Sequence, residues 1–201
     1  MKVTLVDYGA GNLPSVERAL GRLGAESERV AGSAALRAAE AIVLPGVGHF
    51  SALMRTLEER QLRAPLRAAL ARGVPFLGIC LGLQALYESS REAPDDRGLG
   101  LLRGTIEPLP AGVKLPHMGW NQLRRVRSSR LLRGVPEDAY FYFAHSYAAL
   151  HSDKATAAVC CHGADFVAVV EQDNLLAVQF HPEKSGQAGA RVLQNFLESA
   201  Q

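Results

Sequence analysis

Three short apolar segments in the first half of the chain constrain its fold most strongly. They cover residues 2–6, 41–44 and 74–79, and each is followed by a glycine-containing turn and then by a helical pattern, such as Val16, Leu20 and Leu23. Helices that connect parallel strands pack on both faces of the sheet, so the alternation favours an α/β fold with a central, mostly parallel sheet. In such sheets ligands bind beyond the carboxyl ends of the strands, where these turns lie.

The second half of the chain has a different pattern. Beyond residue 100, short strands follow one another without long helices, and segments 166–172 and 175–180 flank Asp173-Asn174, which predicts a hairpin. A helix is expected only at 186–199. The sequence contains no repeat or linker, and 201 residues are too few for two domains of ordinary size. We therefore expect a single domain, residues 1–201, with an additional antiparallel portion.

Charge and cysteine content exclude several classes of protein. The net charge of +2 is too close to balance to indicate a nucleic-acid or membrane partner, and the five arginines between positions 124 and 133 alternate with apolar residues as on a solvated strand. Two of the three cysteines are adjacent, so no disulfide framework or paired zinc motif is available. The apolar opening is too short for a signal peptide. We expect a cytoplasmic protein.

Cys80 lies where a strand pattern changes to a helical one, in the run VPFLGICLGLQAL at 74–86. In an apolar run, a cysteine is often only a small buried side chain. Here, however, Gly78 and Gly82 flank it in the pattern glycine, any residue, nucleophile, any residue, glycine, which is typical of a sharp turn between a strand and a helix. The start of a helix favours the reactive thiolate. Cys80 is therefore a candidate nucleophile.

A cysteine nucleophile needs a base, and His181 is the best candidate among the six histidines. It ends the apolar segment 175–180 and is followed by Pro182 and Glu183. A carboxylate two residues after the imidazole can reach back to its distal nitrogen and hold the tautomer that accepts the thiol proton. The oxyanion formed on attack needs backbone donors, which Leu81 and the glycine-rich turn 45–48 can supply.

Several motifs together resemble the class I glutamine amidotransferases, namely LPGVGHF at 44–50, GICLGLQ at 78–84 and QFHPEKSG at 179–186. Three more narrow the resemblance to the glutaminase subunits of imidazole glycerol phosphate synthases: DYGAGNL at 7–13, KLPHMGWN at 114–121 and FYFAHSY at 141–147. The resemblance runs from residue 3 to about residue 196. It implies the three-layer, flavodoxin-like fold of that family.

The resemblance also implies an activity. Glutamine would be hydrolysed to glutamate through a thioester on Cys80, with His181 as base and then acid and Glu183 orienting it. The ammonia would pass to a cyclase subunit, a (β/α)₈ barrel that forms a heterodimer with this chain and makes imidazole glycerol phosphate in histidine biosynthesis. No cofactor or metal is implied.

The resemblance also implies roles for residues at matching positions of the family motifs. Oxyanion contacts would come from Val47, Gly48 and Leu81. Glutamine would be held by Gln84, Glu92, Ser146 and Tyr147. The cyclase would be met by Asn12, Met118, Trp120 and Lys184. Trp120 is the only tryptophan of the chain, and we expect it in a surface loop formed by residues 116–121 rather than in the core. Pro14 departs from the family pattern and affects only the contacts of its loop.

The sequence gives weaker support to two other functions and to a metal site. A stand-alone cysteine hydrolase of the same superfamily would share the fold and triad, but the motif at 114–121 argues against it. A non-catalytic scaffold or glutamine sensor would have lost one of Cys80, His181 and Glu183, and all three are present. The run Cys160-Cys161-His162 suggests a metal site, but neighbouring side chains on a strand point to opposite faces.

Overall fold

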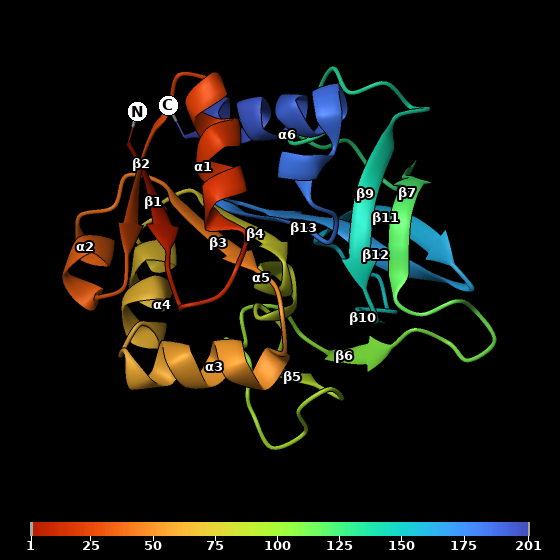
Figure 1. Cartoon of the computed structure of the whole chain (residues 1–201), viewed down its shortest axis with the longest axis horizontal. Coiled ribbons are helices and arrows are strands. Elements are labelled where there is room, and N and C mark those ends of the chain that lie inside the picture. The colour runs from red at the N-terminus through yellow and green to blue at the C-terminus, as the bar shows by residue number, and fades with distance from the viewer. Residues whose placement is uncertain (1, 201) are drawn as a thin grey trace.

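A mixed sheet of eight strands runs through the middle of the molecule in the computed structural model, which describes residues 2–200 (Figure 1). In spatial order the strands are β2 (Glu26–Val30), β1 (Lys2–Val6), β3 (Ile42–Gly46), β4 (Phe76–Cys80), β13 (Leu175–Val178), β12 (Ala164–Gln172), β11 (Thr156–His162) and β8 (Arg124–Arg125). The first five pair in parallel and the last four are antiparallel, β13 belonging to both groups.

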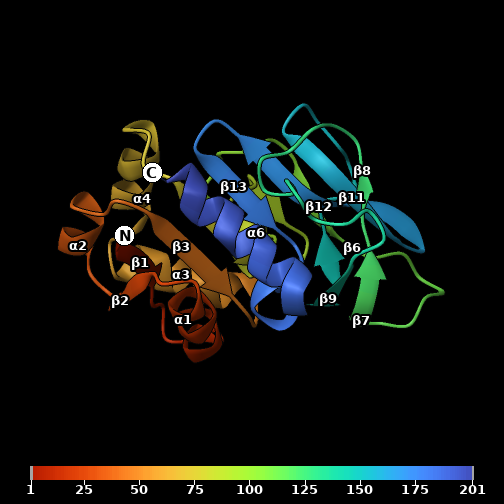
Figure 2. The ribbon, with the colours of Figure 1, turned by 90° about the horizontal axis from the view of Figure 1, so that it is seen from above.

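Helices cover both faces of this sheet. One face carries α1 (Leu13–Arg22) and α6 (Gly186–Ser199), and Figure 2 shows α6 lying over the sheet. The other carries α2 (Ser33–Arg37), α3 (Phe50–Glu59) and α4 (Arg63–Ala71). Residues of β3 alternate between two hydrophobic clusters: Val43 packs with α1 and α6, whereas Ile42 and Leu44 pack with α3 and α4. The expected three-layer α/β arrangement is confirmed.

Two small sheets extend one end of the molecule. Strand β7 (His117–Gln122) pairs antiparallel with β9 (Tyr140–His145), and β10 (Tyr147–Ala148), β6 (Thr105–Pro108) and β5 (Ser89–Ser90) form the other. Two one-turn elements, α5 (Leu81–Gln84) and the 3₁₀ helix η1 (Pro182–Lys184), complete the described chain. No helix within residues 2–200 has the length and apolar character needed to cross a bilayer.

Most sequence expectations for individual elements hold. The hairpin around Asp173 is confirmed, with that residue at a φ of +50°, and so is the helix at 186–199. The surface loop expected at 116–121 is wrong, because residues 117–122 form strand β7, although Trp120 does remain 55% exposed. Strand β2 was not predicted from the sequence, because it is a polar edge strand in which only Val30 is buried. The turn expected at 45–48 starts later, since β3 continues through Gly46.

Candidate active site

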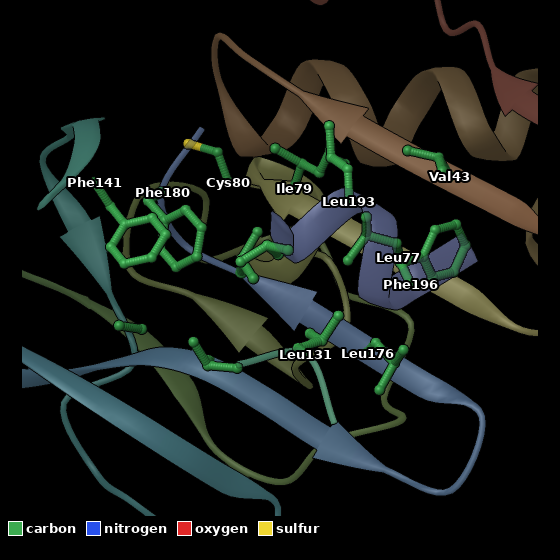
Figure 3. Packing of buried hydrophobic residues seen from close by; sticks show 14 of the residues in the cluster. Val43, Leu77, Ile79, Cys80, Leu131, Phe141, Leu176, Phe180, Leu193 and Phe196 are labelled. Atoms are coloured by element: carbon green, nitrogen blue, oxygen red, sulfur yellow. The ribbon is translucent and has the colours of Figure 1, made fainter. Parts of the chain in front are cut away.

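Cys80 occupies a strained turn at the end of β4. Its φ of +55° and ψ of −108° lie in a region that side chains with a Cβ rarely adopt. Glycine is required at position 82 because the backbone there lies very close to β3: a Cβ on Gly82 would be 1.9 Å from the carbonyl oxygen of Leu44. Figure 3 shows Cys80 at the edge of the hydrophobic cluster, beyond Ile79. The turn thus holds the thiol at the carboxyl end of the parallel strands, as the sequence predicted.

A pocket of about 290 Å³ opens beside this thiol. Ten residues assigned from the sequence line it: Val47, Gly48, Cys80, Leu81, Gln84, Glu92, Ser146, Tyr147, His181 and Lys184. Pro116, Ala144 and His145 also line it and were not assigned beforehand, although they belong to motifs used for the family resemblance. Asn12, Met118 and Trp120 lie outside the pocket lining, as does Glu183, which lies behind His181.

His181 and Glu183 form a buried pair within a single turn. The imidazole Nδ1 lies 2.9 Å from Glu183 Oε1, and the two side chains are only 3% and 1% exposed. Burial by itself lowers the pKa of His181, but the negative charges of the Cys80 thiolate and the Glu183 carboxylate outweigh it and raise that pKa to about 10. The arrangement therefore favours the protonated form of His181, and the Glu183 carboxylate holds the orientation of the ring.

The backbone around His181 is tied to strand β9. The His181 N–H donates to the Tyr142 carbonyl at 2.9 Å, and the buried Ser185 hydroxyl donates to the His181 carbonyl at 2.6 Å. That hydroxyl in turn accepts from the Tyr142 N–H at 3.0 Å. Ser185 was not assigned beforehand, because nothing in the sequence shows that β9 passes beside η1. These bonds hold the His181 backbone in a fixed position relative to the pocket.

The N–H of Val47 does not donate into the pocket in this structure. It donates to the Tyr8 hydroxyl at 2.8 Å, and the same hydroxyl donates to the Val47 carbonyl at 2.9 Å. Tyr8 is 4% exposed, and burial raises its pKa to about 12, so the phenol is neutral and can both accept and donate. Tyr8 lies in the motif at 7–13 but was given no role from the sequence. It holds both polar groups of Val47 on the side of β1.

The residues expected to hold glutamine are also engaged with the protein. Gln84, 4% exposed, donates from Nε2 to the Tyr147 carbonyl at 2.8 Å and to Gln179 Oε1 at 3.2 Å. Glu92 Oε2 accepts from the Phe50 N–H at 2.8 Å and so caps the start of α3. The free sides of these groups face a cavity of a size that suits a small polar ligand.

An exposed apolar patch lies beside the pocket on β7, β9 and the segment before them. It consists of Leu115, Met118, Trp120 and Tyr140, which are 44%, 64%, 55% and 53% exposed. Trp120 packs edge-on against Tyr142 at 6.0 Å, and Lys184 Nζ lies 5.5 Å from the same Tyr142 ring. Asn12 precedes α1 in the loop after β1, at the carboxyl end of the sheet. Aromatic residues exposed in this way are typical of protein interfaces.

No cluster of three or more His, Cys, Asp or Glu side chains suited to a metal occurs in the described part of the chain. Cys160 is buried and Cys161 is exposed, as alternation along β11 requires.

Comparisons with known proteins agree with the resemblance seen in the sequence. A family model described as glutamine amidotransferase class-I matches residues 4–200. The chain is similar to the imidazole glycerol phosphate synthase subunit HisH of Methanothermobacter thermautotrophicus, at 48% identity over 98% of each chain. It is also similar to the subunit of the same name from Desulfitobacterium hafniense, at 47% identity over 96% of this chain and 92% of that one. A crystal structure described as a glutamine amidotransferase shares the fold, with a TM-score of 0.78 at 23% identity over 98% of each chain.

Proposed function

The chain belongs to the class I glutamine amidotransferases and, within them, to the HisH subunits of imidazole glycerol phosphate synthase, and from this premise we propose a role for each residue of the pocket. The protein is a glutaminase that provides ammonia for imidazole glycerol phosphate formation in histidine biosynthesis. We take residues 1–201 as one amidotransferase domain. Cys80, as the nucleophile, must stay reduced, which suits the cytoplasm.

In the proposed reaction, the Cys80 thiolate attacks the carboxamide carbon of glutamine and forms a carbon–sulfur bond. The resulting oxyanion collapses, the carbon–nitrogen bond breaks, and His181 gives its proton to the departing ammonia. Neutral His181 then takes a proton from water, whose oxygen attacks the thioester. The carbon–sulfur bond breaks, glutamate is released, and the Cys80 thiolate is re-formed. The 2.9 Å contact with Glu183 supports its role of stabilising the imidazolium.

Glutamine would be held by Gln84, Glu92, Ser146 and Tyr147, the Glu92 carboxylate meeting the substrate ammonium. Backbone N–H groups of Leu81, Gly48 and Val47 would stabilise the oxyanion. Because the Val47 N–H is bonded to Tyr8 in the isolated chain, we propose that this form lacks one oxyanion donor and turns over slowly. Release of that N–H by the partner would activate the glutaminase.

The proposed partner is the cyclase subunit, a (β/α)₈ barrel. The exposed apolar patch, with Lys184 beside it and Asn12 in the loop after β1, supports this role, because a monomer seldom leaves large apolar side chains grouped in water. A partner seated over the pocket would also receive the ammonia before it escapes to solvent.

The single observation that carries the proposed chemistry is the strained turn that presents Cys80 to a pocket shared with the His181–Glu183 pair. A diazoketone analogue of glutamine should add its mass to Cys80, with exposed Cys161 as an internal control. Cys80→Ala should abolish glutamine-dependent synthesis by the complex and spare synthesis from ammonium salts. Labelling at Cys161 instead, or retained glutamine-dependent activity, would contradict the assignment.

The alternative, a stand-alone hydrolase with the same triad, makes a different prediction. It would act on a γ-glutamyl or peptide bond without an ammonia-accepting partner, and its rate would be the same with and without the cyclase. Glutamate release measured in both conditions separates the two functions.

A further inference from the structure

Gln179 is a buried carboxamide that the reaction described above does not use. It is 0% exposed and lies two residues before His181, directly after β13. Its side chain reaches Cys80: the amide Nε2 lies 3.5 Å from the sulfur. Phe180, between the two, instead packs on Phe141, and Figure 3 shows the two rings next to each other. Their ring centroids are 4.2 Å apart. Gln179 thus reaches the Cys80 sulfur, and His181, two residues later, lines the same pocket as Cys80.

The direction of the Gln179 amide is set by its neighbours. The Tyr147 carbonyl oxygen can only accept, so the Gln84 group that lies 2.8 Å from it must be the NH₂. The other hydrogen of that NH₂ points to Gln179 at 3.2 Å, where it requires the oxygen. The Gln179 NH₂ is then left facing the sulfur. One backbone carbonyl thus determines, through two carboxamides, that a donor and not an acceptor faces Cys80.

The sulfur is the one acceptor that the Gln179 NH₂ contacts among residues 2–200. A neutral thiol is a weak acceptor, whereas a thiolate is a strong one. A fully buried NH₂ group is costly to leave unsatisfied, so its contact is best satisfied when the sulfur carries negative charge. A purely structural glutamine would more simply have bonded to a backbone carbonyl, as the buried Asn195 does.

We propose that Gln179 donates a hydrogen bond to the Cys80 thiolate and, locked in direction by Gln84, stabilises and aims the nucleophile alongside His181. The inference rests on Cys80 being the nucleophile. The two residues then act on the thiolate in different ways. His181 exchanges protons with the reacting groups, whereas Gln179 does not titrate and donates from the same amide dipole throughout the cycle. Once the thioester forms, the sulfur loses its charge and the bond weakens, so it favours the free thiolate over the thioester.

The test measures the pH dependence of Cys80 alkylation by iodoacetamide in the full-length chain, read by peptide mass. Gln179→Met keeps the length of the side chain and removes the donor. We expect the midpoint of alkylation to rise by about one pH unit or more, the size of a lost hydrogen bond to a charged group. In the complex with the cyclase, kcat for glutamine should fall about tenfold with a smaller change in KM.

A second variant keeps the test decisive if Gln179→Met folds poorly. Gln84→Met leaves Gln179 in place but frees its amide to turn, and should raise the alkylation midpoint in the same direction by less. Asn195→Leu is the matched control: it removes a carboxamide that is 2% exposed and donates to two carbonyls away from the pocket. It should lower the melting temperature without moving the alkylation midpoint.

Unchanged midpoints in both glutamine variants would overturn the inference while leaving Cys80 as nucleophile. Glutaminase activity retained by Cys80→Ala would instead overturn the proposed function itself, so the two failures are distinguishable.

Discussion

Removal of the Tyr8 hydroxyl should activate the isolated chain. Tyr8→Phe keeps the buried ring and deletes the hydroxyl that bonds to both the N–H and the carbonyl of Val47, at 2.8 and 2.9 Å. A variant that loses two buried hydrogen bonds ordinarily loses function. Here we expect the opposite for kcat, because the N–H set free is one that we propose as a donor to the oxyanion.

The magnitude follows from those two bonds. At about 1 kcal/mol net for each, the hydroxyl favours the observed orientation of Val47 by about 2 kcal/mol, a factor of roughly 30 in population. An oxyanion donor contributes about 3 kcal/mol to catalysis, so even a minor population with the N–H turned into the pocket dominates turnover. We expect kcat of Tyr8→Phe without the cyclase to rise by about tenfold or more, with KM nearly unchanged because the oxyanion forms after glutamine binds.

The assay is glutamate release by the purified chain, with and without the cyclase and its nucleotide. The ratio of the two rates should shrink by the same factor, because in the complex the N–H would already be turned inward. Tyr87→Phe is the matched control, since Tyr87 is also 4% exposed and lies outside the pocket lining. A folded Tyr8→Phe chain with an unchanged or lower kcat would refute the idea that Tyr8 restrains the oxyanion donor.

Three further predictions concern the base, the histidine pair near the pocket and the exposed patch. His181→Ala should lower kcat in the complex by several orders of magnitude and Glu183→Gln by less, and a glutamine variant with the wild-type rate would show that another group orients the imidazole. Burial lowers the pKa of His145 to about 3 and of His117 to about 4, so both stay neutral in the folded chain while the unfolded chain protonates near pH 6.5. The contribution of these histidines to the free energy of unfolding should therefore be fully present above pH 6.5. It should fall as the pH drops from there toward 4, by up to roughly 1.4 kcal/mol per pH unit for each histidine. In urea unfolding at pH 7 and pH 5, the free energy of unfolding of His145→Gln should change less with pH than that of the parent, and an equal change would contradict this. Trp120→Ala should weaken cyclase binding by about 2 kcal/mol, near 30-fold in Kd by calorimetry, and leave the stability of the isolated chain within about 0.5 kcal/mol, whereas Val126→Ala, another exposed apolar residue at 45%, should change neither.

Features that depend on neighbours in the chain could be read from the sequence. The turn at Cys80 needs only a strand, two glycines and the start of a helix, and His181 and Glu183 meet because they are two residues apart. The hairpin at Asp173 and the helix α6 are local in the same sense. The sites of β1, β3 and β4 followed from their apolar composition, because a strand buried on both faces leaves a continuous apolar run.

Contacts between residues distant in sequence could not be predicted and are seen only in the folded chain. Tyr8 meets Val47 across 39 positions and Gln179 meets Cys80 across 99, and neither pairing leaves a trace in periodicity or composition. Strand β7 exists because β9 lies beside it, and its glycine-containing sequence resembles a loop until that partner is present. The physical reason is that hydrophobic patterning specifies which face of an element is buried but not which polar group it will face. The order of the strands brings particular donors and acceptors together. A candidate nucleophile and base could therefore be predicted from local sequence, whereas the groups that contact the Val47 N–H and the Cys80 sulfur could be identified only in the assembled sheet.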